Sequence, residues 1–383
     1  MEIGSIYEMN PNCIEKAGSL EKETFGLKEV KKHGRENTVY TASAREAISL
    51  VLHSLEKECP DCKKKCLMPA YMCDTVFIPF VRNGWELFFY HIGKDMKADR
   101  VELEALIHQE KPDLLFIHDY YGVDTWAEFR TLFDGWKKTG LRIMEDVTQA
   151  YYLNIGNSAG YVIGSLRKWY AIADGGFATT NHALFDEIVV KDDAFALERF
   201  HVLSKKWDYL QKIQQKESAL TKEQTEVLKQ QKEEFLSGNR ELEERLDNYE
   251  KVTAVSDISM GVLAVTDEEH AMSCRRSNYR ILAEGLKDKK CVLPVIKAPE
   301  EEAVPLYFPV YMENRDKLQE YLRNQDIYVP VLWPVAKENE PVLSQEEQYI
   351  FSHIAAIPMD QRYGKEDMER IVEAINRFGE NYQ

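Results

Sequence analysis

A lysine that could form a covalent bond lies near the middle of the chain. Lys168 follows the apolar run Tyr161–Ser165 and precedes a glycine pair, Gly175–Gly176. A lysine amine that is partly desolvated can attack a carbonyl group near neutral pH and form a Schiff base. Ser165 could donate a hydrogen bond to a phosphate, and the glycines would let the backbone pass close to a bulky ligand. Taken alone, the segment also fits a surface Arg-Lys pair on a loop.

Two adjacent carboxylates end another apolar run, Leu141–Glu145. If this run is a strand, Glu145 and Asp146 point to opposite sides, because side chains alternate along a strand. Asp146 falls just past the predicted strand end, where a pocket would open. A carboxylate there can hold a pyridine nitrogen protonated, which makes the ring an electron sink. The alternative for this segment alone is a helix cap or a loop aspartate.

A predicted helix start supplies the third candidate. Ser43 and Glu46 have the spacing of a capping box. The first N–H groups of a helix and its positive dipole end suit a phosphate, and Arg45 adds a fork of donors. By itself, a capping box is usually only a cap.

Alternating strands and helices would position these residues. Between residue 39 and about residue 180, apolar runs alternate with helical patterns such as Ala44–Glu56 and Val101–Glu110. This order predicts an α/β fold with a mainly parallel sheet covered by helices on both faces. Ligands of such sheets bind beyond the carboxyl ends of the strands. The predicted strands are Cys66–Pro69, Glu86–Tyr90, Asp113–His118, Leu141–Glu145, Tyr161–Ser165 and Gly176–Thr180.

Residues from about 205 to 250 are almost all helix-forming. Apolar residues recur there at threes, fours and sevens, which predicts a helical hairpin or elaboration. Thr221 and Gln224 have the spacing of a capping box, and Ser237–Gly238–Asn239 predicts a break between helices. The pattern fits a solvated helix pair packed on its own fold better than a partner-binding coiled coil.

The remaining chain predicts a small α+β domain. We therefore expect an N-terminal arm (1–38), a large domain (39–261) that includes the helical insertion, and a small C-terminal domain (262–383). The predicted elements of the small domain are helix Glu268–Leu286, strand Leu306–Met312, helix Arg315–Asn324, strand Tyr328–Leu332 and helix Lys365–Phe378.

Composition excludes several functional classes. A length of 383 residues suits two domains. The net charge of -16 argues against binding to nucleic acid or to anionic lipid. The first residues lack the basic and apolar regions of a signal peptide, and no stretch approaches the ~20 apolar residues of a membrane helix. We therefore expect a cytoplasmic protein.

The cysteines predict neither a disulfide framework nor a metal site. Seven cysteines, an odd number spread over a long chain, fit reduced thiols. Cys59, Cys62 and Cys66 have a metal-like spacing, but structural zinc takes four ligands. Free thiols are the favoured interpretation.

Taken together, the motifs resemble the DegT/DnrJ/EryC1/StrS family of fold-type-I aminotransferases, which depend on pyridoxal 5′-phosphate (PLP). Many members of this family act on keto-sugars attached to nucleotides. The resemblance covers most of the chain from about residue 39 and excludes the 205–245 helices. The matching motifs, in chain order, are Ser43–Ile48, Pro69–Cys73, His118–Gly122, Glu145–Gln149, and Lys168 with Gly175–Gly176.

The resemblance implies a role for each residue. Lys168, the first catalytic residue, would form the Schiff base with PLP and then move a proton between the substrate carbon and the cofactor. Asp146, the second, would pair with the pyridine nitrogen, and Gln149 would contact the region of the ring substituents. The phosphate would be held by Ser165, by Ser43 and by the backbone at Ala44 and Arg45.

The implied reaction is two half-transaminations by a homodimer. An amino donor such as glutamate would supply the amino group, and a keto acceptor, such as a nucleotide-linked keto-sugar, would receive it. Two alternatives stay open. The first is a catalytically silent sensor or assembly protein with the same fold, and the second is a PLP-dependent lyase or dehydratase.

The sequence departs from the family pattern at three of the motifs and in its unusual insertion at 205–245. Ser165 lies closer to Lys168 than the family serine does to its lysine. Cys73 occupies the position of a ring-stacking aromatic residue, with Tyr71 nearby, so either residue could contact the cofactor ring. Ala44–Arg45 replaces the usual Gly-Thr of the phosphate turn. These differences suggest a divergent branch of the family.

Overall fold

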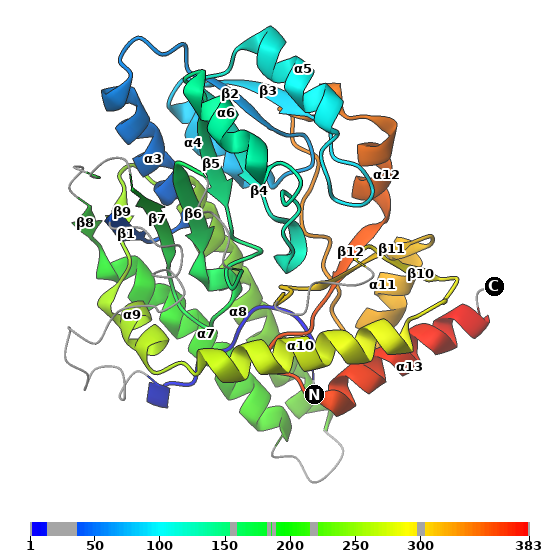
Figure 1. Ribbon diagram of the computed structural model, residues 1–383. Helices are drawn as coiled ribbons and strands as arrows, with labels where there is room; N and C mark the ends of the chain where they lie inside the picture. The colour runs from blue at the N-terminus through cyan, green and yellow to red at the C-terminus, as the bar shows by residue number, and fades with distance from the viewer. Residues whose placement is uncertain are drawn as a thin grey trace.

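In the part of the chain that the structure describes, two β-sheets organise the fold (Figure 1). The computed structural model describes residues 2–13, 37–153, 159–181, 185, 189–214, 221–296 and 303–381. The strands of the larger sheet, in spatial order, are β3 (Glu86–Tyr90), β2 (Lys65–Pro69), β4 (Leu114–His118), β5 (Arg142–Asp146), β6 (Tyr161–Ser165), β7 (Gly176–Thr180), β1 (Asn37–Thr41), β9 (Thr253–Ala254) and β8 (Val190–Lys191). From β3 to β6 all neighbours pair in parallel, whereas β7 and β1 each pair antiparallel with their neighbours. The predicted mainly parallel sheet is confirmed.

Helices cover both faces of this sheet, because alternate strand residues point to opposite sides. Met68 on β2 shares one core with Phe80. Its neighbour Leu67 shares another core with Leu103 on the opposite face. The covering helices are α3 (Ala44–Glu58) and α4 (Asp74–Arg82) on the first face, and α5 (Arg100–Glu110) and α6 (Phe133–Lys138) on the second.

A smaller antiparallel sheet lies in the last third of the chain. Its three strands pack with helices around a separate hydrophobic core. The strands are β10 (Val292–Pro294), β11 (Phe308–Met312) and β12 (Ile354–Ile357), and the helices are α10 (Glu268–Gly285), α11 (Arg315–Arg323) and α13 (Lys365–Asn381), with α12 (Gln345–His353) just before β12.

The predicted strand Tyr328–Leu332 is wrong, because β12 takes the third place in this sheet. Pro330 has no N–H to give to a strand ladder. Its carbonyl accepts one hydrogen bond from the N–H of Ala356 at 3.0 Å, and Tyr328 donates its N–H to the carbonyl of Ile3 at 2.8 Å. The apolar run therefore forms an extended segment with mixed partners.

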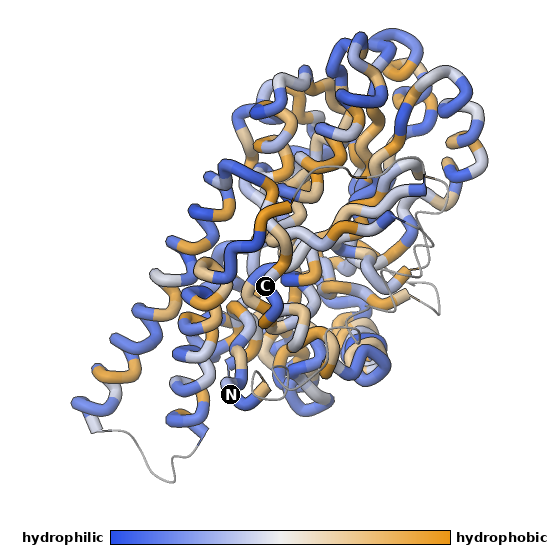
Figure 2. The backbone as a smooth tube through the Cα atoms, turned by 90° about the vertical axis from the view of Figure 1, so that its left-hand side faces the viewer, coloured by the Kyte–Doolittle hydropathy of each residue, from blue (hydrophilic) through white to orange (hydrophobic). Residues whose placement is uncertain are grey.

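Two long helices occupy the region of the predicted insertion. α7 (Asp193–Gln214) and α8 (Lys222–Asp247) lie side by side, mostly hydrophilic with recurring apolar residues (Figure 2). Tyr209 and Phe235 are buried in their shared core. Thr221 and Gln224 form the predicted capping box at the start of α8. The predicted helical character of this region is confirmed.

The predicted break at Ser237–Gly238–Asn239 is wrong, because α8 continues through these residues. A Cβ atom at Gly238 would lie 3.0 Å from Cγ2 of Val202 on α7. Glycine in a helix interior costs about 1 kcal/mol relative to alanine. Here glycine lets α7 and α8 pack closely. This contact explains why a glycine stands inside the helix.

The N-terminal segment, residues 2–9, joins distant parts of the molecule. Ile3 exchanges backbone hydrogen bonds with Asp326 and Tyr328. Glu8 forms ion pairs with Lys206 of α7 and with Arg362. Residues 14–36 of the predicted arm lie outside the described residues.

The predicted boundary between residues 261 and 262 falls within helix α9 (Asp257–Ala264). The division of the chain into domains stays a prediction. Among the described residues, no helix combines the length and the apolar character needed to cross a membrane.

Candidate active site

The strand register brings the predicted residues to one edge of the large sheet. His118 at the end of β4 lies opposite Asp146 at the end of β5. Ser165 at the end of β6 lies opposite Gly176, where antiparallel β7 begins. Thr41 at the end of β1 also pairs with Gly176, so α3 starts at the same edge. This edge is where ligands of parallel sheets are expected.

Lys168 ends a 3₁₀ turn that directly follows β6. Its side chain is reachable by solvent and lines a cavity. Desolvation by the surrounding protein is nevertheless the largest influence on its amine and lowers the pKa of Lys168. Cys73 and Glu243 oppose this shift, whereas Arg167 and Arg45 add to it. A lowered pKa leaves more of the amine in its uncharged, nucleophilic form at neutral pH.

Asp146 is buried and fixed by two hydrogen bonds. Its Oδ2 lies 3.0 Å from Nδ1 of His118, and its Oδ1 accepts the N–H of Thr148 at 2.8 Å. Gln149 uses its amide oxygen to accept the N–H of Tyr121 at 2.8 Å. Nε2 of His118 is buried and has no hydrogen-bond partner among the described residues. His118, which the sequence places only at a strand end, therefore orients the carboxylate of Asp146.

The start of α3 is capped as predicted. Ser43 Oγ accepts the N–H of Glu46 at 3.3 Å and donates to the Glu46 carboxylate at 2.8 Å. A Cβ atom at Gly176 would lie 2.4 Å from the carbonyl carbon of Ser43 and 2.6 Å from the nitrogen of Ala44. This glycine is required for close backbone packing of β7 on the helix start. Ser165, across from Gly176, makes no side-chain hydrogen bond to the turn that follows it.

Tyr71 and Cys73, the two candidates for contact with a ring, have different surroundings. Cys73 Sγ lies 3.2 Å from Oγ1 of Thr75. Burial raises the pKa of the Cys73 thiol, and the charge of Lys168 opposes this rise. Tyr71 is buried in an aromatic cluster with Tyr120, Trp333 and Phe351. The charges of Cys73 and Lys168 therefore influence each other, whereas Tyr71 packs among aromatic rings.

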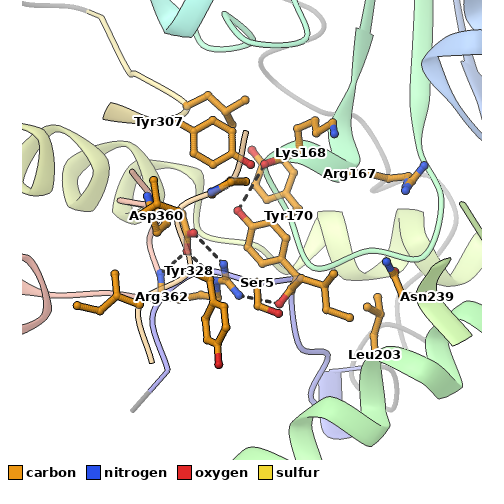
Figure 3. Close-up of a pocket in the computed structure, with 18 of the residues that line it drawn as sticks. Ser5, Arg167, Lys168, Tyr170, Leu203, Asn239, Tyr307, Tyr328, Asp360 and Arg362 are labelled. Carbon is orange, nitrogen blue, oxygen red and sulfur yellow. Dashed lines mark hydrogen bonds and ion pairs between the residues drawn. The ribbon is translucent and has the colours of Figure 1, made fainter. Parts of the chain in front are cut away.

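A cavity of about 570 Å³ opens beside Lys168 (Figure 3). Lys168 and Arg167 lie on one side of it, and Asp360 and Arg362 lie across from them (Figure 3). Tyr7 of the N-terminal segment also lines the cavity. Of the predicted site residues, all of which the structure describes, Lys168 alone belongs to its lining.

Three arginines gather around one carboxylate next to this cavity. Arg45, Arg167 and Arg199 each form an ion pair with Glu243 of α8. Sequence reasoning missed this group because its members lie far apart along the chain. Arg45 was itself a predicted phosphate-binding residue and Arg167 adjoins Lys168, but nothing local indicated a shared partner.

The cysteine segment shows no metal-binding arrangement. Cys59, Cys62 and Cys66 are free thiols. Across the residues that the structure describes, no three or more His, Cys, Asp or Glu side chains are grouped to hold a metal ion.

Comparison with known proteins identifies relatives of the chain. A curated relative is the dTDP-3-amino-3,6-dideoxy-alpha-D-galactopyranose transaminase of Aneurinibacillus thermoaerophilus. It is 24% identical over 296 residues, which cover 73% of this chain and 69% of the relative.

Solved structures share the fold. Helicobacter pylori PseC, an aminotransferase involved in the biosynthesis of pseudoaminic acid, superposes with a TM-score of 0.66 at 14% identity, and covers 100% of both chains. A DegT DnrJ EryC1 StrS aminotransferase from Brucella abortus gives a TM-score of 0.60 at 17% identity, over 97% of this chain and 91% of its own.

The family is established by the sequence itself. Residues 18–376 match the profile of the DegT/DnrJ/EryC1/StrS aminotransferase family. This span includes Lys168, Asp146 and all the other predicted site residues. The chain therefore belongs to the DegT/DnrJ/EryC1/StrS aminotransferase family.

Proposed function

We propose that this aminotransferase uses PLP and transfers an amino group from a donor such as glutamate to a nucleotide-linked keto-sugar. The observation that carries the proposal is the placement of Lys168. Its amine has a lowered pKa and lies at the same sheet edge as the buried carboxylate of Asp146. The curated relative, whose printed name is that of a dTDP-sugar transaminase, supports the sugar acceptor.

The residues at this edge fit PLP by their chemistry. The Lys168 amine suits the carbonyl carbon of the cofactor, and the fixed Asp146 carboxylate suits its ring nitrogen. The first N–H groups of α3 and the hydroxyl of Ser165 suit its phosphate. When bound, PLP supplies an electron sink for charge that develops on the substrate carbon.

Each side chain then has a defined task. Lys168 would hold the cofactor through Nζ and would later carry a proton to and from the substrate carbon. Asp146 would keep the proton on the ring nitrogen, and His118 would keep the Asp146 carboxylate in place. Cys73 would lie beside the Lys168 amine, and Gln149 would keep the Tyr121 backbone in position.

Replacing Lys168 with alanine tests this assignment. We expect the purified wild-type protein to develop the visible absorption of lysine-bound PLP, and the Lys168→Ala protein to lack it. Lys365→Ala is the matched control, because Lys365 is an exposed lysine at the start of α13. An unchanged spectrum in Lys168→Ala would show that another group holds the cofactor.

Adding glutamate to the PLP-loaded protein tests the reaction type. Loss of the visible band on addition of glutamate, with recovery on addition of a keto acid, is the result expected of a transaminase. A band that ignores every amino donor would contradict transamination and favour a silent binder. A band that changes but does not recover on addition of a keto acid would contradict transamination and favour a lyase or dehydratase.

We also propose a homodimer, in line with the expectation that fold-type-I enzymes build each active site from two subunits. Analytical ultracentrifugation of the purified protein measures this directly. A sedimenting mass near that of one chain, 44.5 kDa, would contradict it.

A further inference from the structure

A cluster of cationic side chains between the Lys168 turn and α8 shares the carboxylate of Glu243. Arg45, Arg167 and Arg199 surround Glu243, with Lys168 close enough to influence its charge. The second carboxylate of the cluster, Asp247, pairs with Arg45. Glu46 also acts on Arg45 and Asp174 on Arg167, although burial raises the pKa of both carboxyl groups.

Arg199 is nine-tenths buried and lines the cavity, yet its bonding is incomplete. Its Nη2 donates to Glu243 and, at 3.2 Å, to Oδ1 of Asn239. Its Nε and Nη1 are buried and have no partner among the described residues, and the same is true of Nε of Arg167. Buried guanidinium nitrogens without acceptors are costly, so such a group is expected where an anion binds.

The charges around Arg199 also favour an anion at this site. Burial and the neighbouring charge of Arg167 lower the pKa of Arg199 to about 10. Burial alone would raise the pKa of Glu243, but Arg167 and Arg199 hold it well below its usual range. Glu243 is therefore ionised at all ordinary pH values and acts as a fixed counter-ion.

We propose that Arg167 and Arg199 form a binding site for a phosphoryl group, in which Glu243 is the resident counter-ion. The planar donor groups of a guanidinium match the geometry of phosphate oxygens. A phosphoryl group would supply several acceptors to the buried guanidinium nitrogens that lack them. The inference deepens the proposed function, on which it rests for the identity of the ligand. The phosphoryl group belongs either to PLP or to the nucleotide-linked substrate.

Helices α7 and α8 thereby acquire a role in the site. Arg199 lies on α7, and Glu243 and Asn239 lie on α8, whereas Arg167 adjoins the lysine of the active site. Figure 3 places Asn239 and Arg167 on the same side of the cavity. The helical insertion thus supplies part of the binding surface from within the same chain.

The test is calorimetric titration of the full-length protein with inorganic pyrophosphate, with and without PLP. We expect Arg199→Gln to weaken binding about ten-fold or more, because charge-assisted hydrogen bonds of this strength are lost. Arg245→Gln is the matched control. Arg245 lies on α8 and pairs with the exposed Glu198 instead of with the cluster, so its loss should leave the affinity unchanged.

Glu243→Gln provides a second variant that does not depend on the folding of Arg199→Gln. Removing the counter-ion should tighten pyrophosphate binding, whereas a purely structural ion pair would give lower stability with no gain in affinity. Equal affinity of wild type and Arg199→Gln would overturn the proposal. Equal binding of glutarate, a dicarboxylate of similar size, would overturn its preference for a phosphoryl group.

Comparing the protein without PLP and the protein loaded with PLP identifies the source of the phosphoryl group. If PLP loading abolishes pyrophosphate binding, the site holds the phosphate of the cofactor. If pyrophosphate also binds to the PLP-loaded protein, the site holds a phosphate of the substrate. Failure of the proposed function would appear separately, as the absence of any spectral change with PLP, because pyrophosphate binding requires no turnover.

Discussion

Asp119 is a carboxylate whose surroundings stabilise its charge poorly: its nearest cation is Arg130, whose Nη2 lies 3.7 Å from Oδ1. It is fully buried, and neither of its oxygens has a hydrogen-bond partner among the described residues. Burial, followed by the charge of Glu145, raises its pKa well above the usual range, although Arg130 opposes this. Asp119 therefore keeps its proton in the folded protein at pH values where the unfolded chain has lost it.

This shift makes the stability of the protein depend on pH. Since the folded state binds the extra proton, the free energy of unfolding falls as the pH rises above about 4, the ordinary pKa of aspartate. The substitution Asp119→Asn introduces a neutral side chain of the same shape. We expect this variant to be more stable at neutral pH by roughly 1–3 kcal/mol and to lose less stability with rising pH. Thermal unfolding between pH 5 and pH 8 measures both effects.

Asp134→Asn is the control for this prediction. Asp134 is exposed and pairs with Lys137, whose hydrogen bond lowers the pKa of Asp134. Its replacement should change stability little and without the same dependence on pH. Destabilisation by Asp119→Asn at pH 8 would mean that the carboxylate is charged and well paired.

Single residues were predicted best where they end a strand. Asp146, Ser165 and Lys168 could be placed at one sheet edge because apolar runs predict the strands and the alternation of strands with helices predicts that they run parallel. Arg199 and Glu243 could not, because an ion pair between distant segments leaves no periodic signal. The link between His118 and Asp146 follows from the register of β4 and β5, which the sequence alone does not give.

At the site, β7 packs closely against the start of α3. Gly176 permits it, since any Cβ atom would collide with the backbone of Ser43 and Ala44. We expect Gly176→Ala to displace the first turn of α3, to lower the unfolding temperature and to weaken PLP binding. Differential scanning calorimetry and a PLP titration measure these effects.

Gly135→Ala is the matched substitution. Gly135 lies inside α6, and nothing lies within 4 Å of its added Cβ atom. Alanine there should be neutral or stabilising by about 0.5–1 kcal/mol, because glycine weakens a helix interior. If both variants behaved alike, the tight contact at Gly176 would be irrelevant to the site.

Some helices and strands were predicted from the sequence more accurately than others. The strands from β2 to β7 begin and end within a residue of the prediction, because each is a short apolar run between turns. Tyr328–Leu332 has the same apolar character, but its proline and the presence of β12 exclude it from the sheet. Gly238 predicts a helix end by composition, and only the packing of α7 against α8 explains why the helix continues.

At the scale of the whole molecule, the N-terminal segment links the active-site turn to the small sheet and its helices. The hydroxyl of Tyr7 accepts a hydrogen bond from Nη2 of Arg275 on α10 at 3.0 Å. It also lies 3.2 Å from the carbonyl of Trp169, to which it donates. One phenol thus joins three parts of the chain.

Replacing Tyr7 with phenylalanine should loosen this junction. Arg275 is almost completely buried, so the nitrogen that loses its partner would cost roughly 1–3 kcal/mol. We expect faster hydrogen exchange of the amides in residues 166–170, measured by mass spectrometry. Tyr321→Phe, in the core of the small sheet against Phe378, should leave that exchange unchanged. Equal exchange in both variants would contradict the proposed link.

Contacts between segments far apart in the sequence were the least predictable part of the structure. The alternation of strands and helices predicted a mainly parallel sheet and a second small sheet. It did not predict that residues 2–9 would contact both α7 and the region of the small sheet. Such contacts depend on complementary surfaces formed only after folding.

The way Arg45, Arg167 and Arg199 share the carboxylate of Glu243 has a consequence for evolution. Loss of α8 by deletion would leave Arg45 and Arg167 on the remaining chain without their counter-ion. Both arginines would then repel each other at the sheet edge. The helix and the two arginines should therefore be inherited together, and related enzymes that lack the helix should carry uncharged residues at positions 45 and 167.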